Sequence, residues 1–179
     1  RRRSGMLSPA WSADGTAVFV TVVESYGARA AEVWRFDVAT GAGTRLVENQ
    51  NGQAAPLVSS PAPGAYGPWP TRDGSEVWFT SVTPRPYGSR NGATGSLMRV
   101  PADGGRPEAV RVEGTPALKP VLSPDGSRLV YGAVHEGRTG LKVRDLATGA
   151  ERWLAYDVDR HQLEGRATRD VLPNAAFSP

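Results

Sequence analysis

The 179 residues include no cysteine and only two histidines. Without cysteine the chain forms neither a disulfide framework nor a thiolate metal site, and cysteine usage gives no information about the redox compartment. The two histidines, His135 and His161, fall in separate predicted loops. A hydrolase centre that needs an HxH pair with further His and Asp ligands therefore cannot form within these residues.

Long apolar runs and catalytic motifs are also missing. No stretch of about 18 apolar residues occurs, which predicts no membrane span, and no helical period extends over ten or more residues. Arg1-Arg2-Arg3 precedes a segment without an apolar core, so we expect any secretion signal of the parent protein to lie upstream. A GxSxG elbow, a P-loop and a GxGxxG fingerprint are absent. The sequence therefore predicts no catalytic residues in this segment.

The excess of basic charge is confined to the first three residues. The net charge is +3 and the isoelectric point is about 9.6, yet without Arg1 to Arg3 the chain has 18 basic and 18 acidic residues. A nucleic-acid binder concentrates its basic residues on one face. Here arginine alternates with Asp and Glu along the predicted strands and loops, so we expect a mixed, solvated surface and no nucleic-acid partner.

Glycine and proline are abundant, with 21 and 15 residues, as in turn-rich all-β proteins. The clearest unit is Leu122 to Asp159, in which turn residues separate four short apolar runs. In the turn Ser123-Pro124-Asp125-Gly126, proline presets φ at the second position and glycine accepts the left-handed position that closes the turn. Runs of this length and composition predict a four-stranded antiparallel meander.

This unit is repeated along the chain, and the repeat determines the predicted fold. The first turns contain Asp14-Gly15, Asp73-Gly74 and Asp125-Gly126, and the third turns end with Gly41, Gly105 and Gly149. We predict an all-β, partial β-propeller of about three four-stranded antiparallel blades plus the first strand of a fourth, all one incomplete domain. The predicted bounds are 1–8 for a tail, 9–47, 67–110 and 118–155 for blades 1 to 3, and 172–179 for the start of blade 4.

Three blades and one strand fall short of the four blades that closure needs. The 179 residues are therefore predicted to be a fragment. Its lateral faces would expose apolar surface and favour association, so we expect oligomers or aggregates in sizing chromatography.

Burial is predicted to decrease outward within each blade. The second strands, 16–23, 76–82 and 128–134, are almost continuously apolar, as expected for strands covered on both faces. The third strands alternate more and should lie nearer the rim, with the fourth strands outermost. Trp34, Trp78 and Trp153 occupy similar strand positions and are interpreted as packing residues between blades rather than as a ligand cage.

The connections predict which end of the blades binds a partner. Successive turns of a meander lie at alternate ends, so the short first-to-second and third-to-fourth turns share one end. The longer second-to-third loops and the connectors between blades share the other end, where all the length variation collects. Binding residues concentrate in such loops, and tyrosine and arginine are enriched at binding hot spots; a plain exposed loop is the alternative. The candidates are Tyr26, Arg29, Arg85, Tyr87, Arg90 and Arg138.

One local cluster has metal-ligand chemistry. Asp157, Asp159 and His161 alternate along an extended segment, so their side chains would project to one side and could hold a cation. The alternative is a solvated loop whose acids pair with Arg160 and Arg166. We expect no cofactor in this segment, and these three residues are its only metal candidates.

The repeated turn motif resembles the TolB-type, WD-like propeller repeats of bacteria, in which an apolar residue precedes Ser-Pro-Asp-Gly and a β-rich run. LSPDGSRLVYGAV carries the motif, WSADGTAVFVTVV is a looser version, and PTRDGSEVWFT has Thr71-Arg72 where Ser-Pro is usual. The resemblance covers essentially the whole chain after Ser8. It implies a periplasmic or secreted location and either a protein–protein interaction scaffold or a non-catalytic part of an enzyme.

A narrower resemblance is to the amino-terminal propeller of bacterial amidohydrolases. The segment TGLKVRDLATGAERWLAYDVDRHQLEGRATRDVLPNAAFSP has the WLAY run and the polar connector of that group, with Gly165 where serine is expected. This resemblance implies a hydrolase domain downstream of Pro179 that binds a divalent metal and contacts the propeller. Two functions therefore stay open at this point, a hydrolase scaffold and a binding module without enzymatic activity.

Overall fold

The structure, a computed structural model, describes residues 4–24, 31–48, 64–83, 94–112, 118–136, 138–160 and 175–177. Within those ranges it contains twelve strands and no helix. The described residues accordingly include no helix that could cross a membrane.

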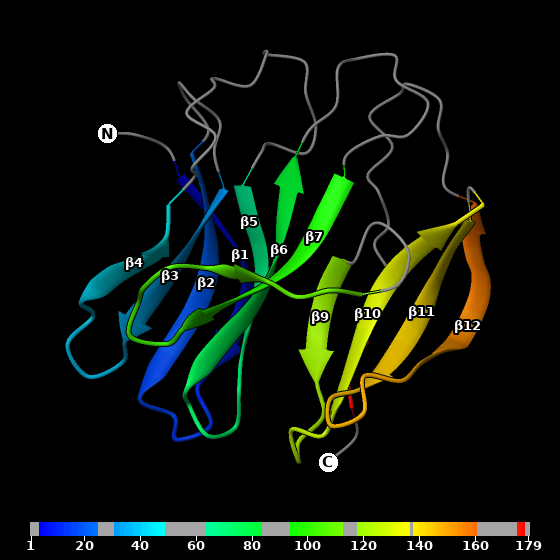
Figure 1. The fold of residues 1–179 in the computed structure, drawn as a ribbon. Helices are drawn as coiled ribbons and strands as arrows, with labels where there is room; N and C mark the ends of the chain where they lie inside the picture. Colours follow the sequence, from blue (N-terminus) through cyan, green and yellow to red (C-terminus); the bar gives the residue numbers. More distant parts are fainter. Residues whose placement is uncertain are drawn as a thin grey trace.

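The strands form three blades in chain order (Figure 1). Blade 1 contains β1 (Ser4–Trp11), β2 (Ala17–Glu24), β3 (Ala31–Asp37) and β4 (Gly43–Val47). Blade 2 contains β5 (Gly64–Pro70), β6 (Glu76–Thr83), β7 (Thr94–Pro101) and β8 (Glu108–Ala109). Blade 3 contains β9 (Leu118–Leu122), β10 (Arg128–His135), β11 (Arg138–Asp145) and β12 (Glu151–Arg160). Each strand pairs antiparallel with the next strand of its blade, which is the predicted meander.

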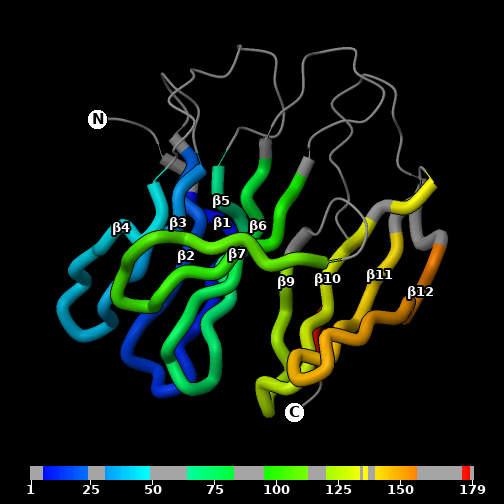
Figure 2. The backbone as a smooth tube through the Cα atoms, viewed as in Figure 1, coloured from blue at the N-terminus to red at the C-terminus, as the bar shows by residue number. Residues whose placement is uncertain are grey.

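The blades are arranged radially, with their first strands nearest one another. β5 contacts both β1 and β9, whereas β4 and β12 lie at the periphery (Figure 2). One parallel bridge, between Ala31 and Gly64, joins blade 1 to blade 2. A Cβ at position 64 would lie 2.0 Å from the Ala31 carbonyl oxygen, and φ is +135°, so glycine is required for this approach. The prediction of an all-β, partial β-propeller is confirmed.

Several strand bounds differ from the predicted blade bounds. β1 begins at Ser4, inside the predicted tail 1–8, because Ser4 to Leu7 pair with the end of β2 across a bulge. β5 begins at Gly64 rather than at 67, and β12 continues to Arg160 rather than ending at 155, because it stays paired with β11. Of the predicted strand 172–178, the structure describes only residues 175–177, which are not in a strand.

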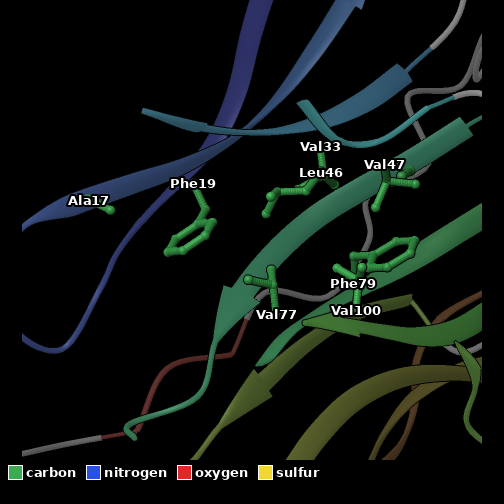
Figure 3. Packing of buried hydrophobic residues seen from close by; sticks show 9 residues of the cluster. Ala17, Phe19, Val33, Leu46, Val47, Val77, Phe79 and Val100 are labelled. Atoms are coloured by element: carbon green, nitrogen blue, oxygen red, sulfur yellow. The ribbon is translucent and has the colours of Figure 1, made fainter. Parts of the chain in front are cut away.

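The interface between blades 1 and 2 forms one hydrophobic core. Phe19 of β2 and Val33 of β3 face Val77 and Phe79 of β6, together with Val100 of β7 (Figure 3). The other members of the cluster are Ala17, Leu46, Val47 and Ala65. Most residues of β2, β6 and β10 are buried, as predicted for strands covered on both faces.

A second core fills the interface between blades 2 and 3. Trp78 of β6 and Leu97 of β7 pack with Leu129 and Tyr131 of β10. The partly buried side chains packed against this cluster are Trp69, Val110, Val112, Leu146 and Trp153. Because large side chains from both blades meet here, the blades are held by lateral packing rather than by strand pairing.

Candidate functional site

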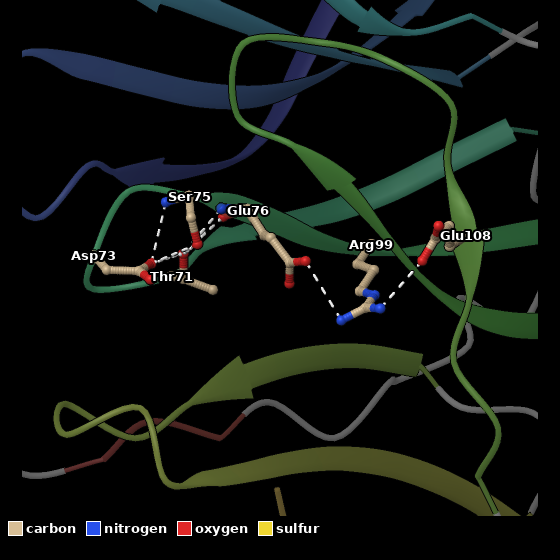
Figure 4. A network of polar contacts seen from close by, with 6 residues as sticks. All are labelled: Thr71, Asp73, Ser75, Glu76, Arg99 and Glu108. Carbon is tan, nitrogen blue, oxygen red and sulfur yellow. Dashed lines mark hydrogen bonds and ion pairs between the residues drawn. The ribbon is translucent and has the colours of Figure 1, made fainter.

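The Asp-Gly turns between first and second strands share one hydrogen-bonding pattern. In blade 2 the Thr71 hydroxyl donates to Asp73 Oδ1 at 2.6 Å and accepts the Glu76 N–H at 3.0 Å (Figure 4). The same Asp73 oxygen accepts the N–H and the hydroxyl of Ser75, at 3.1 and 2.8 Å. The carboxylate thereby fixes the backbone on both sides of Gly74, which has φ +71°.

The equivalent residues of blades 1 and 3 make the same contacts. The serine hydroxyls donate to the carboxylates at 2.7 Å for Ser12 and Asp14 and at 2.5 Å for Ser123 and Asp125. Each carboxylate also accepts the N–H two residues later, at 3.0 Å in both blades. The sequence repeat is therefore a repeat of one turn geometry.

A second pair of aspartates organises the third-to-fourth turns of blades 1 and 3. Asp37 Oδ1 accepts the N–H and the hydroxyl of Thr40, both at 2.7 Å. Asp145 Oδ1 accepts the same groups of Thr148, both at 2.8 Å. In blade 2 this turn has a different sequence, and the Gly104 N–H donates to the Pro101 carbonyl at 3.0 Å.

The two short turns of each blade are bonded to each other. The N–H groups of Val38, Ala102 and Leu146 donate to the carbonyls of Thr16, Ser75 and Ser127, at 2.9, 3.0 and 3.0 Å. All six turns therefore lie at one end of the blades, as the meander predicts, and we call it the turn end. Neighbouring blades are linked there as well, because Arg72 Nη1 donates to the Pro124 carbonyl at 3.1 Å. Arginine at a position where the motif usually has proline thus connects blade 2 to blade 3.

Hydrogen bonds lower the pKa of these carboxyl groups. The Asp14 pKa falls to about 2, chiefly through the Thr16 N–H, the Asp73 pKa to about 2 through the Thr71 hydroxyl, and the Asp125 pKa to about 2 through the Ser123 hydroxyl. The pKa values of Asp37 and Asp145 are also lowered, by the hydroxyl of Thr40 and the N–H of Thr148 respectively. Ionised carboxylates therefore stabilise the turn end.

We expect acid to destabilise the blades through these turns. A carboxyl whose pKa is lower in the folded state than the ordinary 3.8 stabilises the fold above that value, and the contribution is lost as the pH falls from about 4 to about 2. The triple variant Asp14→Asn, Asp73→Asn, Asp125→Asn should be less stable at pH 7 and should lose less stability over that interval. Urea unfolding midpoints at pH 7, 4 and 2.5 measure both effects. Glu136→Gln changes one exposed carboxylate outside the turns and should leave the pH profile unchanged; equal profiles for wild type and the triple variant would contradict the prediction.

The opposite end of the blades, the loop end, contains the predicted binding residues. Five of them, Tyr26, Arg29, Arg85, Tyr87 and Arg90, lie in 25–30 and 84–93, outside the described residues. Arg138 begins β11, where its backbone pairs with His135 and Arg160, but its side chain is outside the described part. The binding role of all six stays a prediction.

Close to Arg138 the structure assembles three aromatic rings that sequence reasoning did not group. Trp153 and Tyr156 of β12 have ring centroids 5.0 Å apart at 61°, and the His135 ring lies 6.3 and 6.2 Å from them. The Tyr156 hydroxyl donates to the His135 carbonyl at 3.4 Å. His135 and Tyr156 are exposed, so an aromatic surface borders the loop end of blade 3. The register of β11 and β12 is irregular here, which explains why simple strand alternation does not reveal the group.

The three tryptophans interpreted as packing residues have different surroundings. Trp78 is buried between blades 2 and 3, and Trp153 packs against the same cluster, which confirms the packing interpretation for both. Trp34 is half-buried, donates its Nε1–H to Glu32 at 3.0 Å, and stacks on Phe36 with ring centroids 6.2 Å apart.

The metal candidates are only partly placed. Residues 157–160 belong to β12 rather than to a loop, and Asp159 pairs through its backbone with Thr139. The side chains of Asp157 and Asp159, and all of His161, lie outside the described residues. Among the side chains that are described, no group of three or more His, Asp and Glu is placed to hold a metal ion.

Curated proteins with similar sequence carry one description. The chain is 33% identical over 83 residues to the Tol-Pal system protein TolB of Xylella fastidiosa (strain M12), covering 44% of this chain and 18% of that protein. It is 35% identical over 65 residues to the protein of the same description from Bordetella avium (strain 197N), covering 36% and 15%. The chain thus matches less than a fifth of the length of these relatives. No family model matches it.

Solved structures share the fold over most of the chain. TolB of Agrobacterium tumefaciens has a TM-score of 0.64 and 20% identity, and the match covers 86% of this chain and 50% of that one. TolB of Acinetobacter baumannii has a TM-score of 0.60 and 19% identity, covering 83% and 32%. Puromycin hydrolase has a TM-score of 0.56 and 19% identity, covering 86% and 21%.

The radial blades and the repeated turns define a β-propeller segment. Sequence and structure comparisons agree on the type of propeller. The chain is a TolB-like β-propeller segment.

Proposed function

We propose that this chain is a non-catalytic, protein-binding segment of a TolB-like propeller. The proposal rests on the difference between the two ends of the blades. The turn end consists of short turns held by aspartate side chains and by bonds between turns, whereas the loop end carries every long connection. A rigid scaffold that presents variable loops at one end is the usual arrangement of a binding module.

The proposed contact residues are the tyrosines and arginines of the loop end. Arg85, Arg90 and Arg138 are the first to test, because guanidinium groups pair with carboxylates and stack on aromatic rings at interfaces. The exposed rings of His135 and Tyr156 would extend this surface on blade 3. The expected partner is therefore another protein with an acidic or aromatic contact surface.

A binding measurement tests this proposal. Purified components of a Tol-Pal system, the system named for the similar proteins, are measured one by one against the immobilised chain. The triple variant Arg85→Glu, Arg90→Glu, Arg138→Glu should weaken the observed binding at least about tenfold. The matched control reverses three exposed arginines at or near the turn end: Arg106, Arg128 and Arg152. Absence of binding to every component, or an equal loss in the control, would argue against the loop end as the binding face.

A bacterial periplasmic or secreted location is part of the same proposal. It rests on the similarity to TolB, and cell fractionation of the tagged native protein tests it. Recovery in the cytoplasmic fraction would contradict it.

The second candidate function is a scaffold within a hydrolase. Its support is the fold shared with part of puromycin hydrolase, of which the match covers 21%, together with the resemblance of the last forty residues to amidohydrolase propellers. In that case a divalent metal and its ligands would belong to a separate catalytic domain, which the propeller would contact. Residues 1–179 should then show no amide or ester hydrolysis with added Zn²⁺ or Mn²⁺, and the native full-length protein should show metal-dependent turnover. Turnover by residues 1–179 alone would contradict both candidate functions.

A further inference from the structure

The two sides of a blade are distinct surfaces in this fold. In blades 2 and 3, one side packs on the preceding blade, through Val77 and Phe79 in blade 2 and through Leu129 and Tyr131 in blade 3. We call this side the upstream face, and the opposite side the downstream face. Both internal interfaces therefore join a downstream face to an upstream face.

Blade 1 has an upstream face with the same register but without a covering blade. Trp11 pairs with Val18 in blade 1, as Pro70 pairs with Val77 in blade 2 and Leu122 with Leu129 in blade 3. Residues paired directly across two strands share a face of the sheet. Trp11 is 63% exposed, whereas Pro70 is buried and Leu122 is 5% exposed.

A second position shows the same contrast. Met6 pairs with Val22 in blade 1, as Ala65 pairs with Ser81 in blade 2. Met6 is 62% exposed and Ala65 is 3% exposed. Positions that the neighbouring blade covers in blade 2 are therefore open to solvent in blade 1.

The remainder of this face is apolar with a charged border. Val18, Val22, Trp34 and Phe36 are half-buried, and the last two stack on each other. Arg45, opposite Trp34 on β4, is paired with Glu32 at 3.3 Å. A contiguous apolar sheet face of this kind is typical of an interaction surface.

The downstream face of blade 3 is also less covered than its counterparts at the outer strands. Leu141 of β11 is half-buried, whereas the equivalent Val33 and Leu97 are fully buried. Ala155, its partner on β12, is half-buried, whereas Val47 in the same place on blade 1 is buried. The chain therefore ends its three blades with one uncovered face of each type.

We propose that the upstream face of blade 1 binds the downstream face of blade 3 of a second copy of this chain. The contact repeats the arrangement of both internal interfaces, because it joins the same two types of face. Two copies joined twice in this way give a closed ring of six blades, which lies within the 4–8 blades of propellers. The chain also spans 50% of the Agrobacterium TolB structure that shares its fold. A head-to-tail contact that closes after two copies is a symmetric dimer.

Sedimentation velocity and light scattering of the 179-residue chain over a hundredfold range of concentration test the stoichiometry. The expected species has twice the 19.0 kDa mass of one chain. Trp11→Lys, with a side chain that is already exposed, should convert it to the single-chain mass with an unchanged circular dichroism spectrum. Val38→Lys, at an exposed valine of the turn end, is the matched control and should remain a dimer. A wild-type chain that stays monomeric at all concentrations, or forms filaments of undefined length, would overturn the proposal.

Mixing two variants tests the head-to-tail geometry. Trp11→Lys blocks the upstream face and Ala155→Lys blocks the downstream face, so each alone should prevent ring closure. An equimolar mixture keeps one intact contact, between the upstream face of the Ala155→Lys chain and the downstream face of the Trp11→Lys chain, and should recover a weaker dimer. If blade 1 faces paired with each other instead, Ala155→Lys would stay dimeric and the mixture would recover nothing further. That result would overturn the proposed geometry even if the wild type is dimeric.

Discussion

Phe79→Ala is expected to destabilise the chain by about 3–5 kcal/mol, the usual loss for a fully buried phenylalanine. Phe79 is 1% exposed and lies between blades 1 and 2, where it packs with Phe19, Val77 and Val100 (Figure 3). Both blades contribute backbone around it, so the site cannot collapse without moving one blade against the other. Removal of the ring should therefore leave a cavity, which adds to the lost transfer free energy.

The measurement is urea unfolding followed by circular dichroism, with Phe79→Leu and Val38→Ala as comparisons. Phe79→Leu keeps most of the apolar volume and should lose much less stability. Val38→Ala truncates a valine that is 48% exposed, and the change should stay within about 0.5 kcal/mol. Similar losses for Phe79→Ala and Val38→Ala would show that the two blades do not share the core described here.

The sequence predicted those parts of the fold that depend on local signals. The Asp-Gly turns were predictable because the hydroxyl, the carboxylate and the glycine that form each turn lie within five residues of one another. The second strands were predictable because burial on both faces produces a continuous apolar run. The arrangement of turns at the two ends followed from the order of strands alone.

Features set by distant residues escaped the sequence reasoning. Residues 4–8 were assigned to a tail because they contain no strand signal, yet they pair with the free edge of β2 and so extend β1. β12 likewise continues beyond 155 because β11 offers it a partner. In both cases backbone pairing with a long neighbour determined the strand length, and residue propensity did not.

The candidate binding site was predicted to the level of an end of the blades. Strand order assigns Arg85 and Arg138 to the loop end whatever their conformation. Which side chains converge there depends on the conformations of long loops, and no periodicity encodes these. The aromatic group of His135, Trp153 and Tyr156 illustrates this, since its members come together only through the irregular pairing of β11 and β12.

The largest departure from the expected burial is Lys142. The sequence of β11 alternates, and its lysine was expected at the solvated rim, yet its side chain is only 8% exposed. Gly140 explains the difference, because a Cβ there would lie 2.8 Å from the Trp153 ring. The absence of that Cβ lets Trp153 lie across β11, and the Lys142 Nζ sits 5.1 Å from the centre of its ring.

Glu151 provides the counter-charge for this lysine. Its Oε2 lies 3.5 Å from Lys142 Nζ, its Oε1 accepts a hydrogen bond from Arg144 Nη1 at 2.6 Å, and its side chain is 4% exposed. Glu151→Ala should destabilise the chain by about 3–5 kcal/mol, because it removes the carboxylate while the cation stays buried. Glu108→Ala is the matched control: Glu108 pairs with Arg99 at 3.1 Å but is 66% exposed, and its loss should stay below about 1 kcal/mol.

The double variant Lys142→Met, Glu151→Ala separates a buried charge from lost packing. If the stability loss of Glu151→Ala comes from the uncompensated cation, replacement of Lys142 by an apolar side chain of similar length should restore a large part of it. If the loss comes from packing alone, the double variant should be at least as unstable as Glu151→Ala. Unfolding midpoints of the four proteins in the cycle, at low and high salt, decide between these outcomes. A loss for Glu151→Ala no greater than that for Glu108→Ala would mean that Lys142 reaches solvent, and the Trp153 arrangement described here would then be wrong.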